Sequence, residues 1–352
     1  MIARGIFLFF CCVLCRPAAA QPGFPAIAAD SLQSRVSGRH WQYYVHLPAS
    51  YRDDRFGVQR YPVIYILDAG SDFAPLVAAV DFLSAGMLPR IPECIVVGIL
   101  HQNRTYELTP FASSEGKDFP GNGGADIFGD FLAEELLPHI DRSYRTNGVN
   151  ALFGHSFGGL FSLYLLSGRP GLFRHVLASD PSLWWDDALH SGAFLSFVRK
   201  EPSAGFQLFV ASSGHDTAEE PEYLRVLRQF TDSLAGVPSL SGRFTGRAYP
   251  DSDHATIMIH ALPDALEWFY RGYKMGFGAF DNPATIPAHY EKLSLLYGYR
   301  LIPPCPLLTA WVDYFMEQGQ KEHALEVWNL AAECYPSARF LKSEKYKALW
   351  KN

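Results

Sequence analysis

The chain has 352 residues, of which 48% are hydrophobic and 19% charged, a composition typical of a globular protein and not of a disordered or fibrous one. The formal net charge is -6, and the sequence holds no basic run. Because binding to a phosphate backbone needs clustered lysine and arginine, we expect no nucleic-acid partner.

The first 20 residues show the order of features that marks a secretory signal peptide. Arg4 gives a positive start, residues 6–14 form a short apolar run, and Ala18-Ala19-Ala20 supplies the small residues of a cleavage site. The run is too short to span a bilayer, which takes about 20 apolar residues, and no later segment is long and apolar enough either. We therefore expect cleavage after Ala20, a periplasmic or secreted protein, and no membrane span in the mature chain.

Three of the six cysteines lie in this N-terminal segment, which leaves Cys94, Cys305 and Cys334. Cys94 falls in the apolar run ECIVVGIL, where cysteine behaves as a small buried hydrophobe. An oxidising compartment would permit a disulfide between Cys305 and Cys334, and two free thiols are the alternative. No cysteine pair has zinc-ligand spacing and no phosphate loop or dinucleotide fingerprint occurs, so we expect neither a metal nor a cofactor.

Short apolar segments bounded by turn residues alternate with helical patterns up to residue 273. An antiparallel strand is expected at residues 39–47, and further strands are expected at residues 61–69, 93–100, 150–153, 174–179, 206–213 and 242–250. Among the helical patterns, residues 125–140 carry apolar side chains spaced by three and four. The alternation predicts an α/β fold with a mainly parallel sheet covered by helices on both faces.

The composition changes after residue 273. A segment rich in glycine and proline indicates a linker, and helices are expected at residues 290–297, 307–318 and 321–335. The last two resemble one tetratricopeptide-type hairpin, and such repeats need about three copies to bury a core, so we expect docking on the main domain. The expected organisation is a signal peptide (1–20), an N-terminal extension (21–38), an α/β domain (39–273), a linker (274–288) and a helical tail (289–352).

The segment NALFGHSFGGLFSLYLL places a G-x-S-x-G pattern, Gly154 to Gly158, between an expected strand and an expected helix. This context is typical of the nucleophile elbow, in which a strained turn aims the serine hydroxyl out of the sheet. The glycines let strand and helix pass closely. We therefore expect Ser156 to be a catalytic nucleophile rather than a turn residue.

A serine hydroxyl needs a base to take its proton and a carboxylate to orient that base. In this type of fold the acid and then the histidine follow the serine along the chain. His254, in the loop YPDSDHATI after the last expected strand, is the expected base. Asp216, which follows strand 206–213, is the first choice for the acid. The alternatives are its neighbours Glu219 and Glu220, and Asp180, which follows strand 174–179.

Acyl transfer passes through an oxyanion that needs fixed hydrogen-bond donors. The backbone N–H of Phe157, directly after the nucleophile, is one expected donor. The other is expected in the loop after strand 61–69, with Ala69, Gly70 and Ser71 as candidates, where glycine would let the backbone approach a substrate.

Three further side chains are candidates for substrate binding. Trp184 and Trp185 follow strand 174–179 and are expected either to wall an aromatic or acyl pocket or to close the core. Arg104 is expected to bind a substrate carboxylate or phenolate, or else to form a structural ion pair.

Several segments together resemble the putative-esterase branch of the α/β-hydrolases, which contains enterochelin (siderophore) esterases and esterase-D-like enzymes: GGADIFGDFLAEELLPHIDRSYRTN, GHSFGGLFSLYLL, DPSLWWDD and VVGILHQNRTYELTP. The resemblance covers residues 39–273, and IPAHYEKLSLLYGY with ALEVWNLAAECYP resembles the tetratricopeptide-like tail of some members. It implies an α/β-hydrolase fold and ester hydrolysis through a serine acyl-enzyme, with Ser156 and His254 at the nucleophile and base positions. The chain departs from the family where Ala69 replaces a glycine and Asp180 replaces the usual serine before PS.

These observations favour a serine carboxylesterase acting on a small-molecule siderophore, short acyl or hydroxycinnamoyl ester. One alternative is an acyltransferase that uses the same acyl-enzyme. Another is a non-catalytic protein whose C-terminal helices bind a protein partner, against which the intact Ser156 and His254 argue.

Overall fold

The computed structural model describes residues 26–70, 73–112, 118–215, 217, 219–279 and 281–350. The expected signal peptide, Ser71 and Asp216 lie outside these residues. Within the described ranges, no helix has both the length and the apolar character needed to cross a bilayer.

Eight strands form one sheet in the order β1-β2-β4-β3-β5-β6-β7-β8. Their bounds are β1 Ile27–Gln33, β2 His40–His46, β3 Tyr61–Ile66, β4 Ile95–Leu100, β5 Thr146–His155, β6 His175–Ser179, β7 Gln207–Ser213 and β8 Phe244–Tyr249. The β1–β2 and β2–β4 pairs are antiparallel and the other pairs are parallel. All strands except β1 were expected. β1 was missed because this edge strand is mostly exposed and lacks an alternating apolar pattern.

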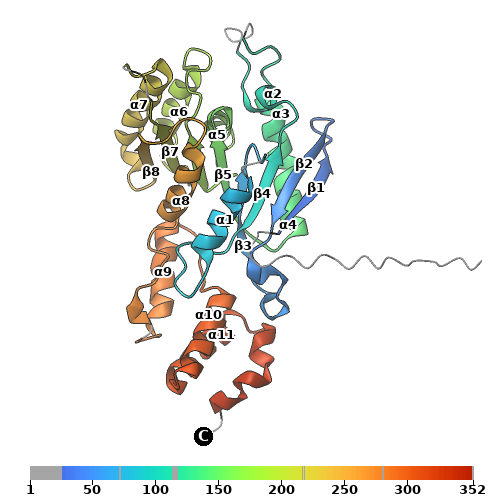
Figure 1. Cartoon of the computed structure of the whole chain (residues 1–352), viewed down its shortest axis with the longest axis vertical. Helices are drawn as coiled ribbons and strands as arrows, with labels where there is room; N and C mark the ends of the chain where they lie inside the picture. The colour runs from blue at the N-terminus through green and yellow to red at the C-terminus, as the bar shows by residue number, and fades with distance from the viewer. Residues whose placement is uncertain are drawn as a thin grey trace, which may run out of the picture.

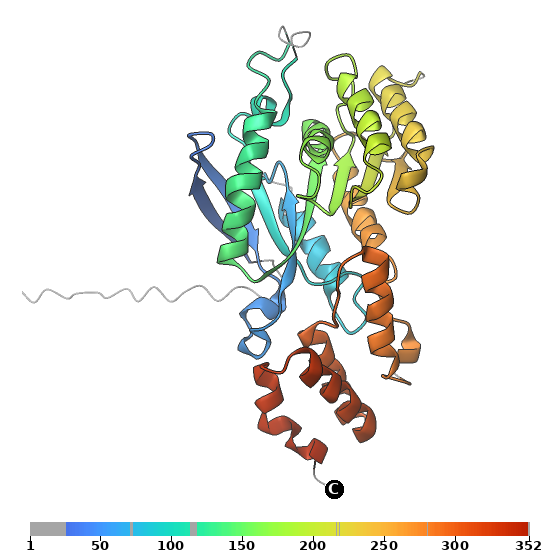
Figure 2. The ribbon, with the colours of Figure 1, turned by 180° about the vertical axis from the view of Figure 1, so that it is seen from behind.

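Alternate residues of the strands face two separate cores, as a sheet covered on both sides requires. In β3, Ile64 and Ile66 pack with α1 (Phe73–Ser84) and α8 (Ile257–Phe269), the helices on the near face in Figure 1. The opposite face, toward the viewer in Figure 2, is covered by the other helices of the domain. These are α3 Ala125–Asp130, α4 Leu137–Ser143, α5 Phe157–Gly168, α6 Leu189–Lys200 and α7 Glu222–Ala235, with a π-helical segment, Phe131–Leu136, joining α3 to α4.

Three chain segments that carry expected site residues leave the sheet at the same edge. β5 runs into α5 at Ser156, Asp180 follows β6, and the loop after β8 carries His254. Because parallel strands all end at one edge of the sheet, these residues meet despite their distance in sequence. The loop after β8 is held in place by Gly214, whose N–H donates to the Ser252 carbonyl at 2.8 Å and where a Cβ would lie 2.1 Å from the Pro250 carbonyl oxygen.

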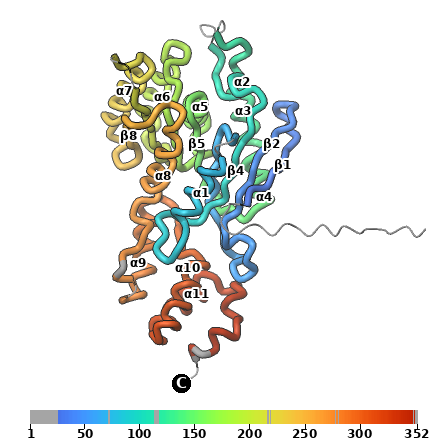
Figure 3. The backbone as a smooth tube through the Cα atoms, viewed as in Figure 1, coloured from blue at the N-terminus to red at the C-terminus, as the bar shows by residue number. Residues whose placement is uncertain are grey.

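The C-terminal helices pack at the other end of the sheet, as the tube in Figure 3 shows. Their bounds are α9 Thr285–Tyr297, α10 Cys305–Glu317 and α11 Lys321–Cys334. The Cys305 N–H donates to the side chain of Gln59, which lies just before β3, and the Trp311 indole donates to the Met87 carbonyl, at 2.9 and 3.1 Å. Buried residues of α9, α10 and α11 belong to the same hydrophobic core as α1 and α8.

The structure differs from the expected linker at one boundary and answers the question of the cysteines. Helix α9 begins at Thr285, inside the segment assigned to a linker. Cys94, Cys305 and Cys334 are free thiols. The likeness of the α10–α11 hairpin to a tetratricopeptide repeat stays a prediction.

Candidate active site

Ser156 lies in a strained turn between β5 and α5. Its φ of 58° and ψ of -118° fall in a region that residues other than glycine rarely adopt. The turn is held by the end of the neighbouring strand β6 and the segment after it. The Ser156 N–H donates to the Ser179 carbonyl at 2.9 Å, and the Ser156 carbonyl accepts from the Ser182 N–H at 3.2 Å. The Ser156 Oγ lies 3.3 Å from the Ser182 Oγ. This is the geometry of a nucleophile elbow.

The glycines of the elbow differ in how much the structure needs them. A Cβ on Gly154 would lie 2.2 Å from the Gly158 carbonyl oxygen, and one on Gly159 would lie 2.9 Å from the Pro181 Cα. At Gly158 the nearest atom would be 3.4 Å away, an ordinary contact. The close passage of helix over strand therefore depends on Gly154 and Gly159 more than on the second glycine of the pattern.

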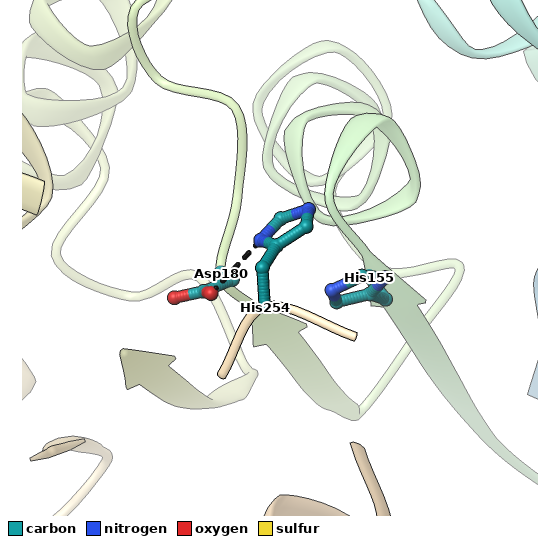
Figure 4. Close-up of side chains that lie close together, drawn as sticks. All are labelled: His155, Asp180 and His254. Atoms are coloured by element: carbon teal, nitrogen blue, oxygen red, sulfur yellow. Dashed lines mark hydrogen bonds and ion pairs between the residues drawn. The ribbon is translucent and has the colours of Figure 1, made fainter. Parts of the chain in front are cut away.

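A buried carboxylate orients His254 (Figure 4). The Nδ1 of His254 lies 2.9 Å from the Asp180 Oδ2, and the Asp180 Oδ1 accepts the Ser213 N–H at 2.7 Å. The Asp180 side chain is 1% exposed, whereas that of His254 is 46% exposed. A carboxylate beside Nδ1 favours the tautomer with the proton there, which leaves the Nε2 lone pair free to accept a proton.

Asp180, an alternative in the sequence analysis, thus holds the position expected for Asp216. Asp216 lies outside the described residues, and Glu220 pairs instead with Arg228 at 2.8 Å. Within the described part of the chain, no hydrogen bond joins Glu219 or Glu220 to His254. The reason is topological, because Asp180 follows β6, which pairs directly with the nucleophile strand β5.

His155, the residue before the nucleophile, packs against the His254 ring with a centroid separation of 4.4 Å. Burial and the neighbouring His254 lower the pKa of His155 to about 4, so this ring is neutral at pH 7. Its Nε2 is buried and has no hydrogen-bond partner among the described residues. No role was predicted for His155 from the sequence.

The described residues show no hydrogen bond between His254 and Ser156. Catalytic hydrogen bonds of this kind are often long in unliganded enzymes and shorten when substrate binds. The position of both residues at one sheet edge, with the acid already bonded to the histidine, is therefore the informative part of the geometry.

The expected oxyanion donors differ in whether their N–H groups are free to bind a substrate. Phe157 is the first residue of α5, so its N–H has no partner within the helix and lies next to the nucleophile. In contrast, the Ala69 N–H donates to the Ile99 carbonyl at 3.0 Å and the Gly70 N–H donates to the Asp68 carbonyl at 2.7 Å. The assignment of Ala69 and Gly70 as donors is therefore wrong in this structure. Asp68 has a left-handed backbone, with φ of 60°, and after it the Ala69 amide bonds across to β4 while the Gly70 amide bonds back to Asp68.

Arg104 forms the structural ion pair that was one of its two expected roles. It begins α2 (Arg104–Leu108), and its Nε and Nη2 donate to the Asp68 carboxylate at 2.7 and 2.8 Å. Nη2 also donates to the His155 carbonyl at 3.0 Å, and the guanidinium lies 5.5 Å from the Phe157 ring. Through the bond to His155, Arg104 stabilises the elbow. Its side chain is 36% exposed, so a ligand can still reach it.

Trp184 and Trp185 differ in their exposure to solvent. Trp185 is 0% exposed, and its indole N–H donates to the Pro110 carbonyl at 3.1 Å, so its proposed contact with substrate is wrong and it closes the core. Trp184 is partly exposed, with its ring 6.0 Å from Phe157 and 5.8 Å from Phe119. Of the two tryptophans, Trp184 is therefore the one that is accessible from the surface.

The sequence is similar to those of known proteins. A family model described as "Putative esterase" matches residues 34–220, more than half of the chain. The ferri-bacillibactin esterase BesA of Bacillus subtilis is 31% identical over 182 residues, which cover 46% of this chain and 60% of the relative's length. The siderophore enterobactin esterase of Emericella nidulans is 38% identical over 204 residues, which cover 49% of this chain and 67% of that protein. This chain thus spans less than two thirds of the Bacillus relative.

Solved structures share the fold. An IroE-like serine hydrolase from Shewanella oneidensis is 27% identical with a TM-score of 0.78, over 88% of this chain and 99% of that chain. The BES protein from Bacillus cereus is 25% identical with a TM-score of 0.59, over 69% of this chain and 94% of that chain. The parallel sheet with helices on both faces is therefore the α/β-hydrolase fold, as expected. The likeness to the Shewanella structure extends into the C-terminal helices.

Proposed function

The chain belongs to the putative esterase family, and from that premise we propose that it is a serine carboxylesterase that hydrolyses ester bonds of a siderophore. The observation that carries the proposal is the bond from His254 to the buried Asp180, at the sheet edge where Ser156 takes its strained turn. The names of the Bacillus and Emericella relatives state siderophore esterase activity for those proteins.

The reaction follows from the roles that the geometry offers. His254 Nε2 accepts the proton of the Ser156 hydroxyl as Oγ bonds to the ester carbonyl carbon. The ester C–O bond then breaks, the protonated His254 gives the proton to the departing alcohol, and the acyl group stays on Ser156. Water, deprotonated by His254, releases the acid and restores the serine. Asp180 keeps the ring in the productive tautomer and stabilises its charged form.

Charge on the carbonyl oxygen is stabilised at the start of α5. The Phe157 N–H is one donor, and the positive end of the helix dipole favours the same oxyanion. The guanidinium of Arg104 lies 5.5 Å from the Phe157 ring, is paired with Asp68 and is 36% exposed.

The surroundings fit an aromatic acyl group. Trp184 and Phe119 are partly exposed and pack on the buried ring of Phe157 beside the nucleophile, and exposed rings of this kind bind flat aromatic groups by stacking and apolar contact. The nearby guanidinium of Arg104 would pair with a phenolate. A catecholate siderophore ester has both features, whereas a short acyl ester has neither.

The test uses purified protein with p-nitrophenyl esters of increasing acyl length, a feruloyl ester and a catecholate trilactone. We expect the trilactone to be hydrolysed with the highest kcat/KM, and Ser156→Ala to lower it by about 10⁴-fold or more, as in other serine triads. Ser182→Ala is the matched control, since it removes the hydroxyl 3.3 Å away, and it should stay within a few-fold of the wild type.

A second readout separates the acyl-enzyme from other routes. A fluorophosphonate that traps active serines should add its mass once to the wild type and to Ser182→Ala, and not to Ser156→Ala. Equal labelling of Ser156→Ala, or turnover of no ester by the wild type, would overturn the proposal. Transfer of the acyl group to an added alcohol in preference to water would favour the acyltransferase.

A further inference from the structure

A cluster at the site combines the donor atoms that divalent transition metals prefer. One ring nitrogen each of His155 and His254 and one carboxylate oxygen of Asp180 all lie within 4.8 Å of one another. Figure 4 shows the three side chains converging from separate elements. Imidazole nitrogen and carboxylate oxygen are both common zinc ligands, and a catalytic or regulatory zinc site needs only three protein ligands with a fourth position open.

The three donor atoms must draw together to bind one ion. Zinc binds histidine nitrogen and carboxylate oxygen at about 2.0–2.2 Å, so in a tetrahedral site two ligands of one ion lie ~3.4 Å apart. Two donor atoms that lie 4.8 Å apart would have to approach by about 1.4 Å. This movement falls to His254, which is on a loop and 46% exposed, whereas His155 and Asp180 are held by the sheet.

His155 is the member of the cluster that hydrolysis does not use. Its Nε2 is buried and has no hydrogen-bond partner among the described residues, an arrangement that costs free energy in a folded protein. Asp180 is oriented independently of the histidines, because its Oδ1 accepts the Ser213 N–H at 2.7 Å. Such support of a ligand by a neighbouring group is typical of metal sites.

We propose that His155, Asp180 and His254 form a binding site for a divalent transition-metal ion of the zinc class, and that the bound ion switches hydrolysis off. The expectation of no metal in the sequence analysis rested on cysteine spacing, which does not detect ligands that come from three different elements.

Inhibition follows whichever nitrogen of His254 binds the ion. An ion on Nε2 occupies the lone pair that would accept the Ser156 proton. An ion on Nδ1 takes the place of the proton that faces Asp180, and the neutral ring then carries its proton on Nε2, where it cannot accept another. The binding half of this proposal is independent of the proposed esterase activity, and only the inhibition half rests on it.

Metal binding is measured first, without turnover. Zn²⁺ is titrated into the full-length Ser156→Ala protein by calorimetry, and then into Ser156→Ala combined with His155→Gln. We expect one ion per chain and an affinity at least about tenfold weaker without His155, because even supporting groups of a metal site change affinity by 10–100-fold. His260→Gln, which removes an exposed histidine of α8 outside the cluster, is the matched control and should leave affinity unchanged.

The visible absorption of bound Co²⁺ gives a second view of the same site and should weaken in parallel. Circular dichroism checks that His155→Gln is folded, and His155→Asn replaces it if it is not. Zn²⁺ affinity that is the same with and without His155, or no binding at all, would overturn the site.

Inhibition is then tested on the otherwise unchanged enzyme. Zn²⁺ should abolish ester hydrolysis reversibly, with recovery on adding a chelator, and His155→Gln should need at least about tenfold more Zn²⁺ for half inhibition. Bound Zn²⁺ with undiminished hydrolysis would overturn the inhibitory role. A chelator-treated wild type that hydrolyses no ester would count against the proposed function alone, since the calorimetry still decides the metal site.

Discussion

Asp180→Asn tests the assignment of the acid with almost no change of shape. The asparagine oxygen still accepts the Ser213 N–H, now bonded to Asp180 Oδ1 at 2.7 Å, so its NH₂ group takes the place of the Oδ2 that faces the His254 Nδ1. Two donors cannot bond to each other. The His254 ring therefore moves its proton to Nε2 in order to accept from the asparagine, and it can no longer act as a base.

The size of the effect follows from this tautomer change. The same exchange in a well-studied serine triad lowers kcat by about 10⁴-fold with the geometry intact, which corresponds to about 5.5 kcal/mol. Here the acid is 1% exposed, so water cannot replace it, but His254 is 46% exposed and water can reach its ring. We expect kcat/KM to fall by between about 10² and 10⁴-fold, with a small change in Tm.

Steady-state hydrolysis of the best ester from the panel is the assay. Glu220→Gln makes the same chemical change in a carboxylate that pairs with Arg228, and its kcat/KM should stay within about twofold. Asp216→Asn is run beside it. A rate for Asp180→Asn within about threefold of wild type, together with a hundredfold loss in Asp216→Asn, would refute the reasoning from the His254–Asp180 bond.

Three further predictions rest on packing and burial. Gly154→Ala should lower Tm sharply and Gly158→Ala only slightly, because the added Cβ would lie 2.2 Å from backbone in the first case and 3.4 Å from the nearest atom in the second; equal melting curves would contradict this. Trp185→Ala should cost about 3–5 kcal/mol in urea unfolding, whereas Trp184→Ala should leave stability nearly unchanged and raise KM for aromatic esters, and the reverse order would refute the division. Burial lowers the pKa of His175 to about 3, so the unfolded chain binds more protons between pH ~6.5 and about 3. This contribution to stability is complete above pH ~6.5 and is lost as the pH falls toward 3. Between pH 7 and 4, the Tm of His175→Gln should therefore drop less than the Tm of the wild type. An identical drop would show that another group causes the loss of stability in acid.

Those features of the protein that depend on local pattern were readable from the sequence alone. The apolar runs predicted the parallel strands, spacing by three and four predicted helical structure over residues 125–140, and the glycines around Ser156 marked the elbow. His254 followed from chain order, since the loop after the last strand must leave the sheet at the edge where the nucleophile lies. Each of these inferences needs only neighbours along the chain and the direction of the strands.

Where the sequence offered two residues of the same type for one role, only the tertiary structure decided between them. Asp180 and Asp216 each follow a strand, and in the structure it is Asp180 that lies 2.9 Å from the His254 ring. Trp184 and Trp185 are adjacent, yet one reaches the surface and the other is sealed in the core. His155 gained a neighbour 99 positions away in the loop of His254. Sequence pattern determines which residues enter a strand or helix, but hydrogen bonds and burial depend on which elements pack together, and that is set by the whole core.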